Sequence, residues 1–260
     1  MSLSLPPTYV EGHNLLKDKR VIVTAAAGTG IGFSVAKRCL EEGASVLISD
    51  IHEGRLKDSA VRLEKETGVQ PATSLCNVTS QEDVDRLFVT AAQTFGETDV
   101  VINNAGLGGT ADLIDMTDDQ WHVVLDVTLN GTFRMTRAAM QTMQGRGGVI
   151  VNNASVLGWR AQKGQAHYAA AKAGVMALTR CAGVEGAELG IRVNAVAPSL
   201  AMHPFLAKVT TEELLTELTA KEAYGRAAEV WEVANVMVFL ASDYSSYMTG
   251  ETVSVSSQRA

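Results

Sequence analysis

The sequence predicts a single α/β domain, built as a doubly wound, mostly parallel sheet of seven strands with helices on both faces. Short apolar runs such as Val21–Thr24 alternate with longer amphipathic stretches, which is the pattern of strand–helix–strand units. A glycine-rich turn follows the first apolar run and leads into a helical pattern. A chain of 260 residues suffices for one such domain, and no linker or internal repeat divides it. We expect residues 1–18 to be a lead-in and residues 19–260 to form the domain.

The composition is that of a globular protein and argues against several classes of partner. Apolar residues make up 46% of the chain and charged residues 20%. The 22 basic residues against 29 acidic ones leave a net charge of −7, which argues against nucleic acid as the main partner. No apolar run approaches the ~20 residues of a membrane span, and the first residues do not read as a signal peptide. We therefore expect a cytoplasmic protein with no membrane partner.

Neither the cysteines nor the histidines have the spacing of a structural site. Cys39, Cys76 and Cys181 are few and scattered, so no disulfide framework is implied and a reducing compartment is expected. The five histidines lie far apart in the sequence, at His13, His52, His122, His167 and His203. We therefore expect no bound metal.

The first strand, Val21–Thr24, and the turn Ala25–Gly32 are expected to form a phosphate cradle. Glycines let the backbone approach a pyrophosphate, and the start of the helix that runs to Glu42 offers free N–H groups with a partial positive charge. A glycine trio alone is weak evidence, but this one stands between a strand and a helix. The residues expected to bind a dinucleotide here are Gly28, Thr29, Gly30, Ile31 and Gly32.

The second strand, Ala44–Asp50, ends in a carboxylate. Asp50 lies 22 residues after Gly28, near the spacing at which an acid binds the adenosine ribose hydroxyls. A carboxylate there accepts two hydroxyl hydrogen bonds and repels a 2′-phosphate, so we predict NAD rather than NADP as the cofactor. The alternative is an ordinary aspartate in a surface turn, and Arg55 nearby would soften the preference for NAD.

The remaining elements continue the alternation. A helix ending at Thr67 precedes a strand at Ala72–Cys76, and a helix at Gln81–Phe95 precedes a strand at Asp99–Ile102. Thr117 is expected to cap a long helix through Met143, because the two aspartates that follow it suit the first turn of a helix. The later elements are expected to be a strand at Val149–Val151, a helix at Gln165–Leu189 and a strand at Arg192–Pro198.

Three polar side chains follow the fifth strand. Ser155 stands just past the strand end, and Tyr168 and Lys172 lie four residues apart, on one face of an Ala-rich helix. A phenol with a pKa near ~10 is a poor base at neutral pH. A lysine ammonium ~4 Å away, at an effective dielectric of ~20, favours the phenolate by about 4 kcal/mol, or roughly three pK units. The pattern predicts proton transfer to or from an alcohol, although a Tyr-x-x-x-Lys pair alone occurs by chance on many helices.

Together, the glycine turn, Ser155, Tyr168 and Lys172 resemble the short-chain dehydrogenase/reductase family in its single-domain form. The resemblance extends from Val21 to Val255. It implies a Rossmann-type fold in which Tyr168 is the general acid/base. It also implies that Lys172 lowers the pKa of that tyrosine and binds the nicotinamide ribose, while Ser155 hydrogen-bonds the substrate oxygen.

The resemblance implies further cofactor contacts. Asn77 and Val78 stand where the family usually has Asp-Val against the adenine ring. An Asn-Asn-Ala-Gly tetrad resembles the element that stabilises the central strand and borders the cofactor, which implicates Asn104, Ala105 and Gly106. The turn after the sixth strand resembles the segment that contacts the nicotinamide carboxamide, which implicates Pro198 and Ala201.

The chain departs from the family pattern at three further places. Gly32 lies eight residues after Thr24 instead of seven, and an alanine replaces the first glycine, so the turn is one residue longer with the extra residue at Ala25 or later. Thr128 stands where the family has an asparagine that opens the helix to a proton-relay water, and a threonine hydroxyl can hold such a water. His203 stands where the family has a threonine.

Two segments are expected to bear on assembly and substrate. Mid-helix glycines cost about 1 kcal/mol against alanine, so Gly174, Gly183 and Gly186 suggest close helix–helix packing. In the family this helix and the preceding long one build a dimer interface, and a homotetramer is expected. The segment 202–225 is expected to be a substrate lid, with apolar contacts from Phe205, Leu206, Leu214 and Leu215.

The predicted function is NAD-dependent interconversion of a secondary alcohol and a ketone. The stretches 24–32, 152–162 and 197–199 resemble a group of actinobacterial steroid-degradation dehydrogenases that act on hydroxylated indane-propanoyl-CoA thioesters. Trp159, next to Arg160, would suit a flat apolar ring system with an anionic tail, unless it simply packs beside the site. Cations expected at the mouth for a CoA thioester are Arg160, Lys163, Lys208 and Lys221, although surface lysines are usually only solvated.

Two alternatives remain open. One is a 3-oxoacyl-thioester reductase of the acyl-carrier-protein type, against which Asp50 counts because such reductases usually prefer NADPH. The other is a non-catalytic NAD-binding scaffold, because a fold does not imply a function. The altered positions Thr128 and His203 favour the scaffold, whereas an intact set of Ser155, Tyr168 and Lys172 opposes it.

Overall fold

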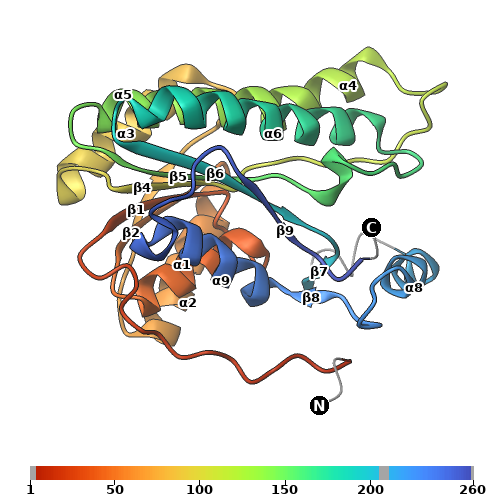
Figure 1. The fold of residues 1–260 in the computed structure, drawn as a ribbon, viewed down its shortest axis with the longest axis horizontal. Coiled ribbons are helices and arrows are strands. Elements are labelled where there is room, and N and C mark those ends of the chain that lie inside the picture. Colours follow the sequence, from red (N-terminus) through yellow and green to blue (C-terminus); the bar gives the residue numbers. More distant parts are fainter. Residues whose placement is uncertain (1–3, 205–210, 259–260) are drawn as a thin grey trace.

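Seven parallel strands form the centre of the computed structural model, which describes residues 4–204 and 211–258 (Figure 1). Their order is β3-β2-β1-β4-β5-β6-β9. The strands are β1 (Arg20–Thr24), β2 (Ser45–Asp50), β3 (Ala72–Leu75), β4 (Val100–Asn103), β5 (Gly148–Asn153), β6 (Ile191–Pro198) and β9 (Thr252–Val255). The chain winds outward from β1 to β3 and then crosses to β4, so the strand order reverses between β1 and β4. The predicted doubly wound sheet is confirmed, and a crevice is expected at this reversal.

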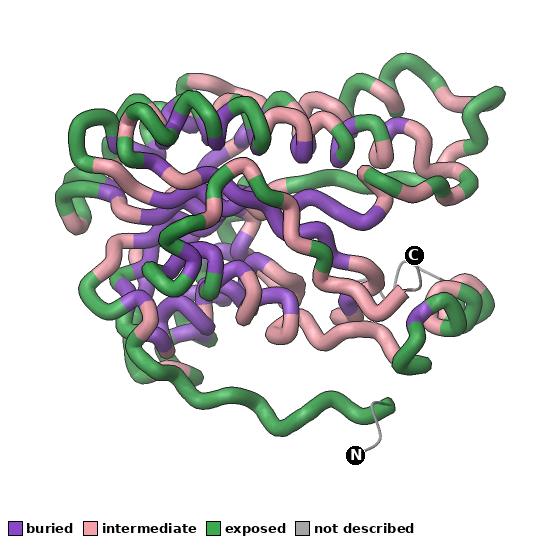
Figure 2. The backbone as a smooth tube through the Cα atoms, in the orientation of Figure 1, coloured by how far each residue is buried: buried purple, intermediate pink, exposed green. Residues whose placement is uncertain are grey.

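Helices cover both faces of the sheet, as Figure 1 shows. The helices of one layer are α1 (Ile31–Glu41), α2 (Glu53–Thr67) and α9 (Val230–Ala241). Those of the other layer are α3 (Gln81–Phe95), α4 (Asp118–Leu125), α5 (Gly131–Met143) and α6 (Ala166–Ala187). Separate apolar clusters fill the space between each layer and the sheet, because parallel strands are buried on both faces (Figure 2).

The long helix expected from Thr117 to Met143 is interrupted. Thr117 does form a capping box with Gln120 at its start. Between α4 and α5, however, residues Asp126–Asn130 form one turn of π-helix, called the π-turn below, in which the Gly131 N–H bonds to the Asp126 carbonyl. A π-turn inserts one extra residue into a helix and is frequent at functional sites. Its consequence here is to turn the Thr128 side chain into the protein, where it is fully buried.

The glycines of α6 pack within their own chain, which corrects the expectation that they serve contact with a second subunit. A Cβ at Gly174 would lie 2.8 Å from Leu129 Cδ2, and one at Gly183 would lie 2.5 Å from the Gly250 amide. A Cβ at Gly186 would lie 2.8 Å from the Ile191 carbonyl. Sequence periodicity placed these glycines on a helix but did not show which side faces the sheet. A large residue at Gly183 therefore disturbs the fold of one chain rather than its assembly.

The expected lid, 202–225, starts in β7 (Ala201–Met202) and contains helix α8 (Glu212–Ala220). Strand β8 (Ala228–Glu229), which pairs with β7 in a two-stranded sheet, follows it. Helix α8 stands away from the main body in Figure 1 and has no buried residue. Leu214 and Leu215 are half-buried. The expected contacts of Phe205 and Leu206, and Lys208, lie outside the described residues.

The lead-in is tied to the end of α1. The Glu42 carboxylate accepts hydrogen bonds from the backbone N–H groups of His13 and Leu15, at 2.8 and 3.0 Å. It also pairs with the Arg38 guanidinium at 2.6 Å. Leu16 is fully buried in the core between the sheet and the α1–α2–α9 layer. No helix within residues 4–204 and 211–258 has the length and apolar content to cross a membrane.

The turn after β1, which we expect to be one residue longer than in the family, contains a strained alanine. Ala25 has a φ of 49°, in the left-handed region that favours glycine. The following N–H groups are held by neighbouring elements: Ala26 bonds the Ser49 carbonyl at 3.0 Å, and Gly28 bonds the Ser59 hydroxyl at 2.9 Å. The alanine seen in the sequence in place of the family glycine therefore keeps a glycine-like backbone.

We expect Ala25→Gly to stabilise the fold by up to about 1 kcal/mol, because a left-handed non-glycine residue costs about 1–2 kcal/mol and the added chain freedom of glycine offsets part of the gain. Thermal unfolding monitored by circular dichroism measures the change. Ala26→Gly is the matched control and should destabilise, because Ala26 is buried and does not have a positive φ. Equal destabilisation by both changes would contradict the strain at Ala25.

Candidate active site

One asparagine joins three strand ends at the carboxyl edge of the sheet. The Asn104 Nδ2 donates to the Thr24 and Ala25 carbonyls at 3.2 and 3.1 Å. Its Oδ1 accepts from Asn153 Nδ2 at 2.9 Å. These bonds connect the ends of β1, β4 and β5 across the point where the strand order reverses. Asn104 therefore lies beneath the crevice rather than pointing freely into it.

The glycine turn and the start of α1 fit a dinucleotide phosphate. Gly28 has a φ of 112°, and Gly30 is the N-cap residue of α1 with no side-chain cap bond. A Cβ at Gly32 would collide with the Ala25 carbonyl and the Asn104 amide, so the first turn of α1 can sit this close only because residue 32 is glycine. Thr29, Gly30 and Ile31 are half-buried at the turn surface. The first N–H groups of a helix lack intrahelical acceptors and attract anions.

Asp50 is positioned against this turn. It is 8% exposed at the end of β2, and its carboxylate accepts from Ala27 N at 3.3 Å and from His52 N at 3.0 Å. Burial raises the pKa of Asp50, while the bond from Ala27 and the Arg55 guanidinium 3.8 Å away lower it. A carboxylate in this position suits hydroxyl groups of a bound ribose.

The expected adenine contacts lie on the loop after β3. The Asn77 Oδ1 accepts from the backbone and hydroxyl of Thr79, at 3.1 and 2.9 Å, so its oxygen is engaged in its own turn. Val78 packs against the π-turn, where a Cβ at Gly131 would lie 2.7 Å from Val78 Cγ2. Ala105 N donates to the Thr24 hydroxyl at 3.1 Å, which holds the loop after β4 over β1.

Ser155, Tyr168 and Lys172 come together, as the sequence predicts. Ser155 follows β5 and is 8% exposed, and its Oγ accepts from Leu157 N at 3.2 Å. Burial raises the pKa of Tyr168, and a hydrogen bond with the Ser155 side chain lowers it by a smaller amount. The buried Lys172 ammonium donates to the Asn153 carbonyl and lies 5.5 Å from the centre of the Tyr168 ring. Two helical turns of α6 and the end of β5 thus supply a hydroxyl, a phenol and an ammonium.

Burial dominates the ionisation of this set, which corrects one expectation. The sequence suggests that Lys172 brings the pKa of Tyr168 close to neutral, but in the structure the pKa of Tyr168 is raised above its ordinary value. The pKa of Lys172 is lowered to about 8 by the same cause, because the site disfavours both charged forms. At neutral pH the phenol is therefore protonated and is suited to donate a proton.

Thr128 lies beside this set but is bound to the backbone. Its Oγ1 accepts from Leu107 N at 3.0 Å and donates to the Leu107 carbonyl at 3.1 Å. A Cβ at Gly106 would lie 3.5 Å from the Lys172 ammonium and 3.7 Å from the Thr128 hydroxyl, so the three meet at one place. The hydroxyl hydrogen of Thr128 is already donated to the Leu107 carbonyl, and one lone pair of its oxygen remains free to accept a hydrogen bond. The structure thus gives Thr128 a clamping contact with the loop after Gly106.

A cavity of about 270 Å³ lies beside this set, although Lys172 is not among the described residues that line it. Ser155 and Tyr168 line it together with Pro198, Ala201 and Ile31, all expected from the sequence. His203 also lines it, near Gly30, and burial lowers the pKa of its imidazole. The lining residues that sequence reasoning missed include Leu157, Gln162, Leu200, Leu218 and Gln258. Gln258 reaches the cavity from the far end of the chain, and no local pattern signals such a return.

Only some of the residues expected to recognise the substrate lie near the cavity. Arg160 and Lys221 line a groove of about 600 Å³ next to the cavity. Lys163 instead pairs with Asp112 at 3.1 Å on a side chain that is 87% exposed. Trp159 is 53% exposed and is not among the described residues that line the cavity, so its expected contact with a ring system is not supported.

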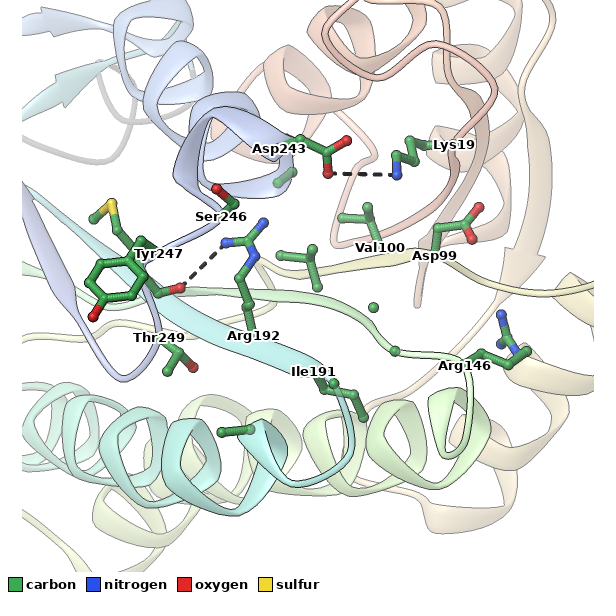
Figure 3. A pocket seen from close by; sticks show the side chains of 17 residues that line it. Lys19, Asp99, Val100, Arg146, Ile191, Arg192, Asp243, Ser246, Tyr247 and Thr249 are labelled. Carbon is green, nitrogen blue, oxygen red and sulfur yellow. Dashed lines mark hydrogen bonds and ion pairs between the residues drawn. The ribbon is translucent and has the colours of Figure 1, made fainter.

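A second cavity, of about 670 Å³, lies at the opposite edge of the sheet, where β4, β5 and β6 begin (Figure 3). Its charged groups have partners within the protein. Lys19 pairs with Asp243 at 3.8 Å, and Arg192 Nη1 donates to the Leu240 and Ser245 carbonyls at 3.2 and 3.0 Å. Ligands of doubly wound sheets bind beyond the carboxyl ends of the strands. We therefore place the chemistry in the smaller cavity.

Comparison with known proteins agrees with this geometry. The family model described as enoyl-(acyl carrier protein) reductase matches residues 25–257. The chain is similar to the (5R,7aS)-5-hydroxy-7a-methyl-1-oxo-2,3,5,6,7,7a-hexahydro-1H-indene-carboxyl-CoA reductase of Mycobacterium tuberculosis, with 57% identity over 260 residues and 99% of each chain covered. It is also similar to a 3-oxoacyl-[acyl-carrier-protein] reductase of Thermotoga maritima, with 36% identity, 92% of this chain and 97% of the other covered. The crystal structure of a short chain dehydrogenase from Mycobacterium smegmatis superposes with a TM-score of 0.88 at 55% identity, covering 99% of this chain and 100% of that one.

The ionisation of the site leads to a direct measurement. We expect Lys172 to titrate at about pH 8, below the exposed lysines, because its ammonium is buried. Carbon-13 NMR of labelled lysine side chains measures this pKa. Lys172→Met identifies the resonance, and the exposed lysines serve as the internal reference. A Lys172 resonance that titrates together with the exposed lysines would contradict the assigned cost of burial.

Proposed function

Because the chain belongs to the short-chain dehydrogenase/reductase family and is an oxidoreductase acting on a CH–OH/C=O pair, we propose that it reduces a steroid-derived bicyclic ketone carried as a CoA thioester. The observation that carries this proposal is the 57% identity, over 99% of both chains, to a reductase named for such a substrate. The groove next to the reaction cavity supports it, because a CoA thioester is larger than the cavity alone.

The residues of the site divide the work of ketone reduction. A bound nicotinamide dinucleotide supplies the hydride. Ser155 holds the carbonyl oxygen by donating its hydroxyl hydrogen, and Tyr168 gives that oxygen its phenolic proton. The raised pKa of Tyr168 suits it to act as an acid in this direction. Below about pH 8 Lys172 is cationic, so it stabilises the phenolate that remains.

NAD is the proposed cofactor within the NAD(P) pair that the family uses. Asp50 supports this choice, since its buried carboxylate faces the glycine turn and would repel a 2′-phosphate. Arg55 lies 3.8 Å from that carboxylate, its side chain is 53% exposed, and its positive charge favours the 2′-phosphate of NADP. Asp50 is fixed by two backbone bonds, whereas Arg55 is held only at its charged end, so the carboxylate should dominate.

A linear 3-oxoacyl thioester is the rival substrate. The relative of that type shares 36% identity, well below the 57% of the bicyclic-substrate reductase. The scaffold alternative is set aside because the chain is an oxidoreductase whose hydroxyl, phenol and ammonium are assembled. Assays of NADH oxidation with a bicyclic indane-type oxo-thioester and with a linear 3-oxoacyl thioester separate the two substrates. Preference for the linear one would overturn the proposed substrate.

We expect Tyr168→Phe to lower turnover by roughly 10²- to 10⁴-fold, because general acid–base catalysis is worth that much. Steady-state rates measure the loss, and fluorescence titration with NADH should show nearly intact cofactor binding. Tyr244→Phe removes an exposed phenol outside the site and is the matched control. If the Tyr168→Phe variant kept more than a tenth of the activity, Tyr168 would be removed from the mechanism.

We expect Asp50→Ala to lower the ratio of kcat/KM for NAD over NADP by about tenfold or more, because charge-assisted hydrogen bonds to the ribose are lost and the repulsion of the phosphate is lifted. Arg55→Ala is the matched change and should raise the same ratio. Comparable wild-type rates with NADP and NAD would count against the role given to Asp50.

We further propose a homotetramer. Exposed apolar side chains lie on the α4–α5–α6 layer at Val123, Phe133 and Val184, and others lie near the edge strand β9 at Tyr244 and Tyr247. Two separate self-complementary patches give a dihedral tetramer, a common form of closed assembly. Light scattering should give about four times the 27.6 kDa chain mass, and Val184→Glu should lower it. The mass of a single chain would exclude the assembly.

A further inference from the structure

The reaction cavity adjoins the groove of about 600 Å³. Leu157, Gln162, Leu218 and Gln258 line both spaces. The cavity itself, at about 270 Å³, is slightly smaller than typical ligand sites, which measure about 300–1,000 Å³. A substrate with a long polar tail must therefore leave the cavity, and the groove is the adjoining exit.

Arg160 stands in this groove with its charge available. Its Nη1 donates to the Gln258 Oε1, a neutral acceptor. Within residues 4–204 and 211–258, no carboxylate lies within ion-pair distance of the Arg160 guanidinium. A guanidinium has five N–H donors in a planar fork that matches phosphate oxygens. A neutral side chain thus orients the half-buried Arg160, and no ion pair among the described residues offsets its positive charge.

The C-terminal segment holds Gln258 in place. Glu222 is 4% exposed, and its carboxylate accepts from the Ser257 hydroxyl at 2.8 Å and from Gln258 Nε2 at 3.1 Å. Residues 222 and 258 also form an antiparallel bridge. Since the amide nitrogen of Gln258 is taken by Glu222, its oxygen faces Arg160. Glu222, which also lines the groove, is therefore connected to Arg160 by hydrogen bonds only through a neutral amide.

Lys221 adds a second cation to the same groove. Its ammonium pairs with Glu217 at 2.8 Å, one helical turn away, and both side chains are more than half exposed. Exposed pairs of this kind contribute little and exchange partners readily. A polyanion in the groove would meet Arg160 on its wall next to Gln258 and Lys221 at the adjoining turn.

We propose that this groove binds the phosphate-bearing part of CoA, with Arg160 as the residue that contacts a phosphate and Gln258 as its positioning residue. The inference rests on the proposed function, in which the acyl ring occupies the cavity beside Tyr168. The pantetheine arm then passes the shared wall of Leu157 and Leu218. The C-terminal segment 256–258 becomes part of the substrate site.

Arg160→Gln tests this with two thioesters of the same bicyclic oxo-acid, one of CoA and one of pantetheine, which lacks the phosphates. For the CoA thioester KM should rise about tenfold or more, because hydrogen bonds to charged groups are worth that much, while kcat stays within about twofold. The KM of the pantetheine thioester should not change, which also shows that the variant is folded. Arg160→Lys should restore part of the loss, and Lys163→Gln is the matched control outside the groove.

Gln258→Ala separates positioning from contact. It should raise the KM of the CoA thioester in the wild-type background and have no further effect in Arg160→Gln, because it acts through Arg160. Equal changes for the two thioesters, no change in Arg160→Gln, or additive effects of the two substitutions would overturn the proposal.

Binding of CoA itself keeps this proposal distinct from the proposed substrate. Isothermal titration calorimetry of the full-length protein with CoA needs no turnover. Weaker binding in Arg160→Gln, even if the bicyclic thioester is not reduced, supports the groove while the substrate assignment fails. Undetectable CoA binding by the wild type at millimolar concentration, or equal binding by wild type and Arg160→Gln, overturns the groove even if the thioester is reduced.

Discussion

The amide of Asn104 is the interaction on which the site most depends. It donates to the turn after β1 through Thr24 and Ala25 and accepts from Asn153 at the end of β5. The Asn153 carbonyl in turn receives the Lys172 ammonium. One chain of hydrogen bonds therefore runs from the glycine turn to the acid–base groups. Asn104 thus links the position of the glycine turn to that of Lys172.

Burial of the side chains sets the pKa values of Lys172 and Tyr168. Lys172 is 3% exposed, and its ammonium donates to a carbonyl rather than to a carboxylate. A neutral acceptor solvates the ammonium only in part, so burial lowers the pKa of Lys172 while raising that of Tyr168. Reduction of a ketone begins with a protonated phenol, which burial favours. Oxidation of an alcohol begins with a phenolate, which burial opposes.

The parts of this site that sequence could predict are those with short spacing. Ser155, Tyr168 and Lys172 lie within one strand–helix unit, and Asp50 ends the strand after the glycine turn. Helical and strand periodicity place such residues directly. The end of α2 and both boundaries of α3 agree with the sequence for the same reason, since turn residues stand at these positions. The parts that could not be predicted depend on pairs far apart in the chain. Gln258 meets Arg160 across 98 positions, and Gly183 packs against Gly250, which is also far away along the chain. No local period encodes either contact.

The π-turn at Thr128 could not be predicted from periodicity either, because a single inserted residue changes which helix face is buried without changing the residue types. The predicted ionisation was wrong for a related reason, since a sequence gives the distance between two charges more readily than their burial.

A protein with a net charge of −7 can still bind a polyanion, because binding depends mainly on the charges close to the binding groove. At physiological salt the Debye length is about 8 Å, so exposed acidic residues on distant faces are largely screened from the groove. Arg160 is less screened because it is half-buried, and Glu222, the buried acid nearest to it along the hydrogen-bond chain, reaches it through the neutral Gln258. Had Glu222 paired with Arg160 directly, the guanidinium would have been neutralised in place, and a phosphate would have to displace a buried ion pair. The interposed amide avoids that competition while it still orients the fork.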